Sequence, residues 1–204
     1  LGLMGCSITT CFLMAGHTVV AIAPIPIDLE HAEKRIHDHL VRSHEHGLII
    51  ESPEFYFKRL TISDDYGALQ NCDVVVECTL EKIDIKRTVY EKIEAVIREE
   101  SILTSNTSAI PISILQKLTK FPRRFFGLHW AEPSHTTRFL EIICGDDSDP
   151  ELAEQLYTLS HRWGKEPTLG RKDIRGFITN RLMYAMYRED FYLVDYGYAT
   201  IEGV

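Results

Sequence analysis

The chain has 204 residues, of which 45% are hydrophobic, and its formal net charge is -8. This length and apolar content can bury one core and begin a second. Without a basic block, nucleic acid is not expected as a partner, and no run of about 18 apolar residues could span a bilayer. The five cysteines are scattered and form no C-x-x-C pair, a pattern typical of free thiols in a reducing compartment. We therefore expect a cytoplasmic protein.

The predicted elements alternate between helices and strands along the chain. Periodic apolar residues predict helices over residues 2–14, 28–47, 53–60, 84–98, 113–118, 149–163 and 176–196. Short β-branched or apolar runs predict strands over residues 18–23, 60–62, 72–77, 101–104, 125–129, 139–144 and 167–169. Strands that alternate with helices predict an α/β fold with a doubly wound, mainly parallel sheet.

Two features set the expected domain boundaries. Gly2 and Gly5 fit the second half of a dinucleotide-binding glycine turn, so the first strand of that motif would precede this chain. At the other end, Gly176 begins a helix with too many apolar side chains to be only a surface helix. We therefore predict a Rossmann domain over residues 1–174, with its first strand missing. Residues 175–204 would be the truncated start of an all-α substrate and dimerisation domain.

The glycine turn is the first candidate site. A pyrophosphate would lie against the helix N-terminus, where free N–H groups and the helix dipole favour anions. The segment Gly2-Leu3-Met4-Gly5 is therefore the candidate phosphate-binding element for NAD. The acid expected at the end of the next strand is absent, because Ala23 stands there. Asp28 could substitute for it, and the residues alone leave the choice between NAD and NADP open.

A histidine and a carboxylate form the second candidate site. His129 ends one apolar strand, and Glu141 lies inside another. A lone histidine of this kind is more often a satisfied core residue. Buried charged groups, however, are costly unless they are paired. A His–Glu pair would satisfy both side chains, and the carboxylate would fix the tautomer of the ring.

Polar residues at two further places could bind a ligand. The run Ser105-Asn106-Thr107-Ser108 follows a predicted parallel strand, at the end where ligands bind in open α/β sheets. A helix-capping loop is the alternative. Asn180, one turn into the last helix, could be solvated or could hold a substrate oxygen. The histidines at positions 31, 37, 39, 44 and 46 have no metal-ligand spacing, so we expect a solvated helix face and no metal site.

Together these segments resemble the 3-hydroxyacyl-CoA dehydrogenase family over essentially the whole chain. The resemblance is carried by ordered motifs at matching spacing. They are the glycine turn with Ala15-Gly16-His17, Val75-Val76-Glu77 with Glu81 and Lys86, the Ser105–Ser108 run, Gly127-Leu128-His129, Leu140-Glu141-Ile142, Trp163-Gly164-Lys165-x-Pro167 and Asp173-x-x-Gly176-Phe177-Ile178-x-Asn180-Arg181.

The resemblance implies an NAD-dependent enzyme that reversibly oxidises a 3-hydroxyacyl-CoA, such as 3-hydroxybutyryl-CoA, and that dimerises through its helical domain. By position, His129 would take the 3-hydroxyl proton while hydride leaves C3 for the nicotinamide. Glu141 would orient this base. The substrate oxygen would contact Ser108 and Asn180, and the cofactor site would be lined by Glu81, Lys86 and Asn106.

Two positions depart from the family pattern. One is Ala23, and the other is Glu132, which precedes Pro133 where the family commonly has asparagine. Both indicate a divergent branch, so a dehydrogenase of a non-CoA 3-hydroxy acid or sugar acid is an alternative. The related β-hydroxyacid dehydrogenases would carry a lysine where Gly176 stands. A non-catalytic dinucleotide-binding relative is a further alternative, against which the intact candidate residues argue.

Overall fold

The computed structural model describes all residues from Leu1 to Val204, and its strands form two sheets. The smaller, two-stranded sheet pairs β1 (Val19–Ile22) with β2 (Leu60–Ser63) in parallel. The larger sheet contains, in spatial order, β3 (Val74–Glu77), β4 (Ile102–Ser105), β5 (Phe125–Trp130), β6 (Phe139–Cys144) and β7 (Glu166–Gly170). Neighbouring strands are parallel except for β5 and β6, which are antiparallel. This architecture confirms the predicted mainly parallel α/β fold.

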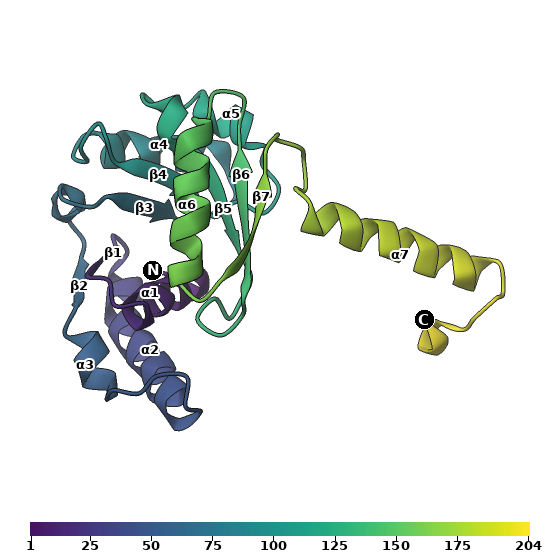
Figure 1. The fold of residues 1–204 in the computed structure, drawn as a ribbon, viewed down its shortest axis with the longest axis horizontal. Coiled ribbons are helices and arrows are strands. Elements are labelled where there is room, and N and C mark those ends of the chain that lie inside the picture. Colours follow the sequence, from purple (N-terminus) through teal and green to yellow (C-terminus); the bar gives the residue numbers. More distant parts are fainter.

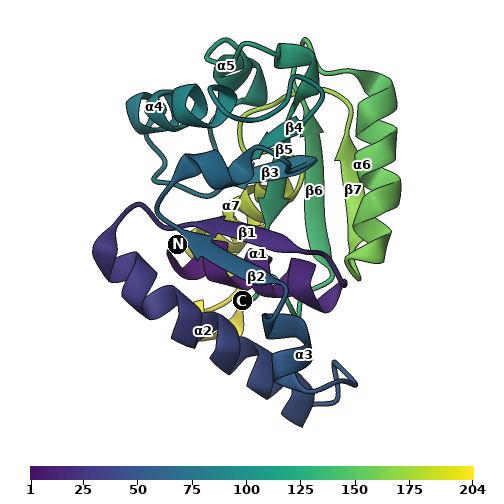
Figure 2. The same ribbon diagram turned by 90° about the vertical axis from the view of Figure 1, so that its left-hand side faces the viewer.

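Helices cover both faces of the sheets, as the two perpendicular views show (Figures 1 and 2). They are α1 (Leu3–Met14), α2 (Pro26–Glu45), α3 (Pro53–Phe57), α4 (Ile83–Glu94), α5 (Ile112–Gln116), α6 (Pro150–Arg162) and α7 (Thr179–Asp195). Short 3₁₀ turns span Tyr66–Leu69, Pro122–Arg124 and Ile201–Gly203. No helix is long and apolar enough to cross a membrane. Helix α4 ends earlier than predicted, because the N–H of Val96 bonds back only three residues, to Ile93.

The alternation of side chains along β5 decides on which face of the sheet each side chain lies. Phe126, Leu128 and Trp130 pack in one cluster with residues of α1 and α6. Phe125 points the other way and packs in a second cluster with residues of α4 and α5. Because successive side chains of a strand point to opposite faces, His129 shares the face of Phe125. The candidate base is therefore carried on the α4 and α5 side of the sheet.

Helix α5 approaches this face of the sheet closely at Gly127. A Cβ atom added to Gly127 would lie 2.8 Å from Cδ1 of Ile112 and 3.1 Å from Cβ of Ile143. Only a glycine leaves room for that contact without displacing α5. The close packing holds α5 and the loop before it against the strand that ends in His129.

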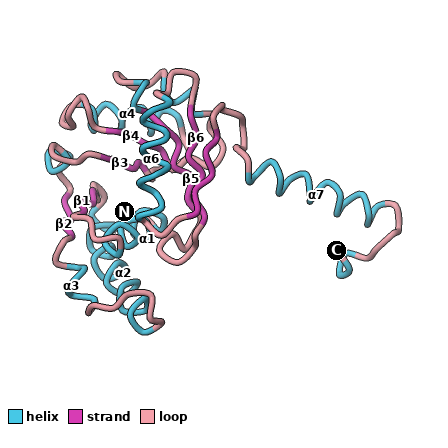
Figure 3. Tube along the Cα trace, in the orientation of Figure 1, coloured by secondary structure: helices cyan, strands magenta, loops and turns pink.

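Helix α7 extends away from the sheets, with little of its surface covered (Figures 1 and 3). It has no buried residue. Three of its large apolar side chains, Leu182, Met186 and Phe191, are 63%, 65% and 70% exposed. A helix with such a surface normally packs against further protein. The second, helical domain from residue 175 stays a prediction.

The two sheets meet through side-chain packing rather than through hydrogen bonds, since Val20 and Ile22 of β1 pack against the cluster that contains Val75 of β3. Strands β1 and β3 are not paired neighbours, and α1 contributes residues to the cores on both sides, including Ile8 in one cluster and Cys6 in another. The strand predicted to precede Leu1 also stays a prediction.

Candidate functional site

His129 and Glu141 lie directly opposite each other in the antiparallel pair of β5 and β6. Their side chains point to the same face, and Nδ1 of His129 is 2.8 Å from Oε2 of Glu141. The two residues are 8% and 1% exposed. The contact occupies Nδ1 and leaves Nε2 of the imidazole for a ligand. The structure thus brings together the two residues that the sequence predicts as a pair.

The second carboxylate oxygen of Glu141 binds the beginning of α7. Oε1 accepts hydrogen bonds from the backbone N–H groups of Ile178, at 3.1 Å, and Thr179, at 2.9 Å. Burial alone would raise the pKa of Glu141, but the hydrogen bonds from His129 and Thr179 outweigh it and hold the pKa below its ordinary value. Glu141 is therefore ionised at neutral pH, and its charge orients Nδ1–H of His129 as a donor.

Ser108 and Asn180 meet although they are far apart in sequence. The side-chain amide of Asn180 donates to the carbonyl oxygen of Ser108 at 2.9 Å. The loop that carries Ser108 follows β4, and Ser105 of that strand pairs with Gly127 of β5. Because β4 and β5 are parallel, the loop two residues after Ser105 is level with His129, which lies two residues after Gly127. The predicted oxygen-binding residues and the predicted base thus share one end of the sheet.

Asn106 has a structural partner in the neighbouring strand. Its Oδ1 accepts a hydrogen bond from the backbone N–H of Trp130, the residue after His129, at 3.0 Å. Its own backbone N–H donates to the carbonyl oxygen of Glu77 at 2.8 Å. Asn106 therefore ties the end of β3 to the end of β5. Its contact with a cofactor stays a prediction.

The N-terminus of α1 has the features that a diphosphate group requires. The first bond of the helix runs from the N–H of Cys6 to the carbonyl of Gly2 at 3.1 Å, and no side chain caps the turn. The N–H groups of Leu3, Met4 and Gly5 consequently have no acceptor in the protein. A Cβ atom at Gly2 would meet nothing within 4 Å. Free N–H groups and an open approach at a helix N-terminus fit the pyrophosphate of NAD.

The end of β1 does not offer a carboxylate to the cofactor. Ala23 stands there and is 1% exposed. Asp28, the possible substitute, lies in the first turn of α2, directly after this strand end. Its contact with the ribose hydroxyls of a dinucleotide stays a prediction.

Lys86 is buried in an ion pair, and it contacts the candidate loop through Glu81 and through the hydroxyl of Ser105, at 3.4 Å. Its ammonium lies 2.9 Å from both oxygens of Glu77 and 3.5 Å from Oε2 of Glu81. Glu77 also accepts from Tyr90 at 3.0 Å and from Ser105 at 2.7 Å. The network joins the ends of β3 and β4 to α4. A direct contact of Lys86 with the cofactor stays a prediction.

Glu81 holds the loop that carries Ser108. Its Oε1 accepts from the side chain of Thr107 and from the backbone N–H groups of Ser108 and Ala109, at 3.0 and 3.1 Å. Burial alone would raise its pKa, but the Thr107 hydrogen bond and the charge of Lys86 keep the pKa below its ordinary value. Glu81 is thus a charged anchor for this loop.

Sequence reasoning did not assign roles to two residues that the structure places at the site, Glu77 and Phe177. Glu77 ends an otherwise apolar strand, so the argument that singled out Glu141 would also have found it. Phe177 packs its ring against His129, with ring centroids 5.4 Å apart. No local pattern signals this contact, because it depends on how the chain turns before α7.

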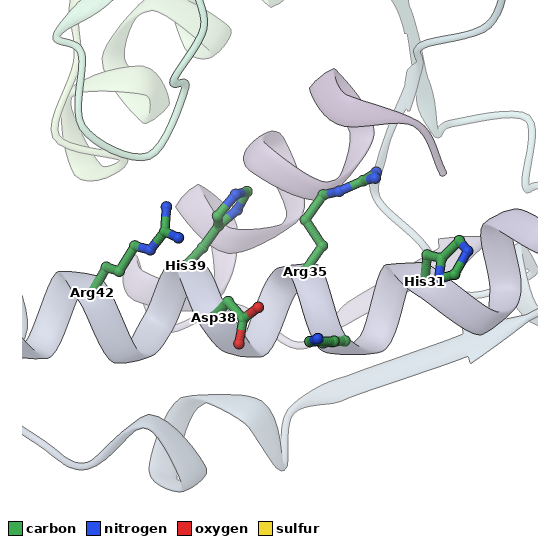
Figure 4. Close-up of a pocket in the computed structure, with 6 residues that line it drawn as sticks. His31, Arg35, Asp38, His39 and Arg42 are labelled. Atoms are coloured by element: carbon green, nitrogen blue, oxygen red, sulfur yellow. The ribbon is translucent and has the colours of Figure 1, made fainter.

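A basic groove of about 250 Å³ runs along one side of α2 (Figure 4). The side chains that line it are all polar or charged: His31, Lys34, Arg35, Asp38, His39 and Arg42. The ring of His39 stacks on that of His135 at a centroid distance of 4.4 Å. His135 belongs to the connection from β5 to β6, so the groove adjoins the loop that leaves the strand of His129.

Comparisons with known proteins agree with this geometry. Residues 1–174 match the family model described as 3-hydroxyacyl-CoA dehydrogenase, NAD binding domain. The 5-formyl-3-hydroxy-2-methylpyridine 4-carboxylate 5-dehydrogenase of Mesorhizobium japonicum is 33% identical over 97% of this chain. A probable 3-hydroxybutyryl-CoA dehydrogenase of Deinococcus radiodurans is 30% identical over 100% of this chain and 73% of its own length. The family resemblance and the prediction of NAD as the cofactor are confirmed.

A solved structure shows the same fold. The crystal structure of 3-hydroxybutyryl-CoA dehydrogenase from Escherichia coli is 30% identical, has a TM-score of 0.90, and is matched over 97% of this chain and 42% of that chain. The chain spans 63% of the length of its Mesorhizobium relative. These similar proteins differ in their named substrates, since one is named for a pyridine carboxylate and the others for an acyl-CoA.

Proposed function

Because this chain belongs to the 3-hydroxyacyl-CoA dehydrogenase family, we propose that the protein reversibly oxidises a short-chain 3-hydroxyacyl-CoA, such as 3-hydroxybutyryl-CoA, to the 3-oxoacyl-CoA with NAD. The observation that carries the proposal is the buried His129–Glu141 pair, with Nδ1 engaged at 2.8 Å. An ionised carboxylate behind a histidine leaves the far ring nitrogen as a proton acceptor. A carbinol that loses hydride needs such an acceptor for its proton.

His129 transfers the proton, and Glu141 stabilises and orients the ring that carries it. NAD, bound with its pyrophosphate at the N-terminus of α1, would supply the hydride acceptor. Nε2 of His129 takes the proton of the 3-hydroxyl group during oxidation and returns it during reduction. The negative charge of Glu141 stabilises the imidazolium that forms, and its hydrogen bond keeps Nε2 aimed outward. Both oxygen atoms of the Glu141 carboxylate accept hydrogen bonds, which holds the carboxylate against the ring.

Ser108 and Asn180 would hold the reacting oxygen. The Ser108 side chain is exposed and has no hydrogen-bond partner in the protein, whereas its backbone is fixed by Glu81 and Asn180. A hydroxyl on a fixed backbone is preorganised to bind the C3 oxygen as its charge changes. These two assignments are part of the proposal.

The basic groove favours a CoA thioester over a free acid. Lys34, Arg35 and Arg42 face one acidic side chain, Asp38, so the groove is positive although the chain as a whole is negative. The phosphates of CoA carry several negative charges, which such a groove would attract. A free hydroxy acid carries a single carboxylate and would not need it.

The second candidate substrate is a hydroxy compound without CoA. The observation in its favour is the Mesorhizobium relative, which is named for a pyridine carboxylate and is 33% identical. Glu132, where asparagine is common in the family, is exposed in the loop after His129. A carboxylate at this position would alter the charge that a substrate meets as it enters.

The deciding experiment measures absorbance at 340 nm with the full-length protein. Acetoacetyl-CoA and free acetoacetate are each tested with NADH and, separately, with NADPH. We expect NADH oxidation with acetoacetyl-CoA that His129→Ala abolishes. Arg42→Gln should raise KM for acetoacetyl-CoA, whereas Arg171→Gln, a change of an exposed arginine outside the groove, should leave it unchanged. Turnover of acetoacetate alone would replace the CoA substrate by the second candidate.

We propose also that the whole protein acts in the cytoplasm as a homodimer. All five cysteines are free thiols, which suits a reducing compartment. The exposed apolar side chains of α7, Leu182, Met186 and Phe191, suit packing within a helical domain that pairs two chains. Sedimentation equilibrium of the full-length protein would test this, and a monomer at micromolar concentration would reject the dimer.

A further inference from the structure

The ring of His129 contacts two phenylalanine rings. Phe139 meets it edge-on, with centroids 5.7 Å apart and planes at 88°. Phe177 meets it at 5.4 Å with planes at 59°. Phe177 is 1% exposed although it stands at the beginning of the segment that leads to α7. These two contacts restrict how far the imidazole can tilt or flip.

The backbone at Phe177 has a conformation that few residues adopt. Its φ is 51°, and it is the only residue other than glycine in the chain with a positive φ. Gly176, directly before it, has a φ of 81°. A bulky residue in the left-handed region is uncommon and persists where the surrounding structure holds it there. Burial of the ring against His129 supplies that constraint.

The same turn supplies the donors that hold Glu141. Two successive left-handed residues reverse the chain so that the next two N–H groups, those of Ile178 and Thr179, converge on one carboxylate oxygen. Successive N–H groups in such a turn form a concave binding site for an anion. One short turn therefore contacts both members of the pair, His129 through a side chain and Glu141 through the backbone.

We propose, on the basis of the proposed function, that Phe177 is a positioning residue for His129. Its ring limits the orientation of the imidazole, and its left-handed backbone aims the two following amides at Glu141. The turn continues into α7, where Asn180 binds the carbonyl of Ser108. The position of this turn thus sets the base, its carboxylate and the oxygen-binding loop together.

The test compares two substitutions at Phe177 with a matched control. Phe177→Leu keeps an apolar side chain but removes the aromatic wall. Phe177→Asn accepts the left-handed backbone and removes the wall as well. The control is Phe126→Leu, which removes a fully buried ring from the opposite face of the same sheet. Thermal unfolding of each full-length variant establishes that it is folded.

Kinetics give the first readout. Because small misplacements of reacting groups are costly, we expect both Phe177 variants to lower kcat by roughly tenfold to a hundredfold. KM for NADH should change by less than about twofold, since the N-terminus of α1 is untouched. Phe126→Leu should keep kcat within about twofold of the wild type at a temperature where it is folded. Equal losses of kcat in Phe126→Leu and Phe177→Leu would overturn the proposal.

Nuclear magnetic resonance of the imidazole gives a readout that does not need turnover. In the wild type, Nδ1–H of His129 should give a slowly exchanging proton signal with a single tautomer. In folded Phe177→Leu, we expect faster exchange and a mixture of tautomers. A signal identical to that of the wild type would overturn the positioning role. If the wild type shows no turnover with any substrate, the proposed function fails, and this signal alone still decides the role of Phe177.

Discussion

The ion pair between Lys86 and Glu77 joins α4 to the end of β3. A substitution of Lys86 measures how much this pair contributes to the free energy of unfolding. The two side chains are 1% and 0% exposed, and their charged atoms are 2.9 Å apart. Lys86→Met keeps most of the side-chain volume and removes only the ammonium group. Glu77 would then keep its carboxylate in a site without a counter-charge.

The expected loss follows from the donors that remain. Breaking a buried ion pair by removing one partner costs about 3–5 kcal/mol. Glu77 would still accept from the N–H and hydroxyl of Thr79, from Tyr90 and from Ser105. These four donors place the expected loss near the lower end of that range, at about 3 kcal/mol in the free energy of unfolding.

Urea denaturation of the full-length protein, followed by circular dichroism, measures this loss. Adding Glu77→Gln to Lys86→Met removes the uncompensated charge, so the double variant should recover at least about 1 kcal/mol. Lys82→Met, which changes an exposed lysine next to the same helix, should stay within about 0.5 kcal/mol of the wild type. The reasoning is refuted if Lys86→Met costs less than about 1 kcal/mol, or if the double variant loses the sum of both single changes.

Three further predictions concern single positions. Glu141→Gln should lower kcat by at least about a hundredfold with KM for acetoacetyl-CoA little changed, because His129 loses its orienting charge; an unchanged kcat contradicts the pair. Gly127→Ala should destabilise the fold by about 1–3 kcal/mol in urea, since its Cβ would lie 2.8 Å from Ile112; a neutral result would show that α5 can shift. Burial and the charges of His39 and Lys165 lower the pKa of His135 to about 4. Its unfolded pKa is about 6.5, so the unfolded state binds more protons between these values, and stability falls as the pH drops from about 7 to 4. After allowance for solvent screening this loss is about 1 kcal/mol, and His135→Gln should remove it, whereas the exposed His161→Gln should not.

The sequence by itself determined the order and kind of the main elements. The run Val74-Val75-Val76 predicts a buried strand because it is β-branched and apolar, and the spacing of Leu29, Ile36 and Leu40 predicts a helix. Both signals are local, so they can be interpreted without knowledge of the fold. The pairing of His129 with Glu141 could also be predicted, because an unpaired charge inside an apolar strand is too costly to be left alone.

The tertiary structure decided which groups share a contact across long separations. The antiparallel register of β5 and β6 places His129 opposite Glu141, and nothing in either strand specifies that register. Lys86 turns toward Glu77, nine residues earlier, because α4 folds back over the end of β3. The left-handed turn at Phe177 packs against His129 and donates to Glu141, and no local pattern signals these contacts. The spacing of apolar side chains and the cost of burying an unpaired charge can be judged from nearby residues. Strand register and backbone strain depend on contacts that form only when the chain is folded.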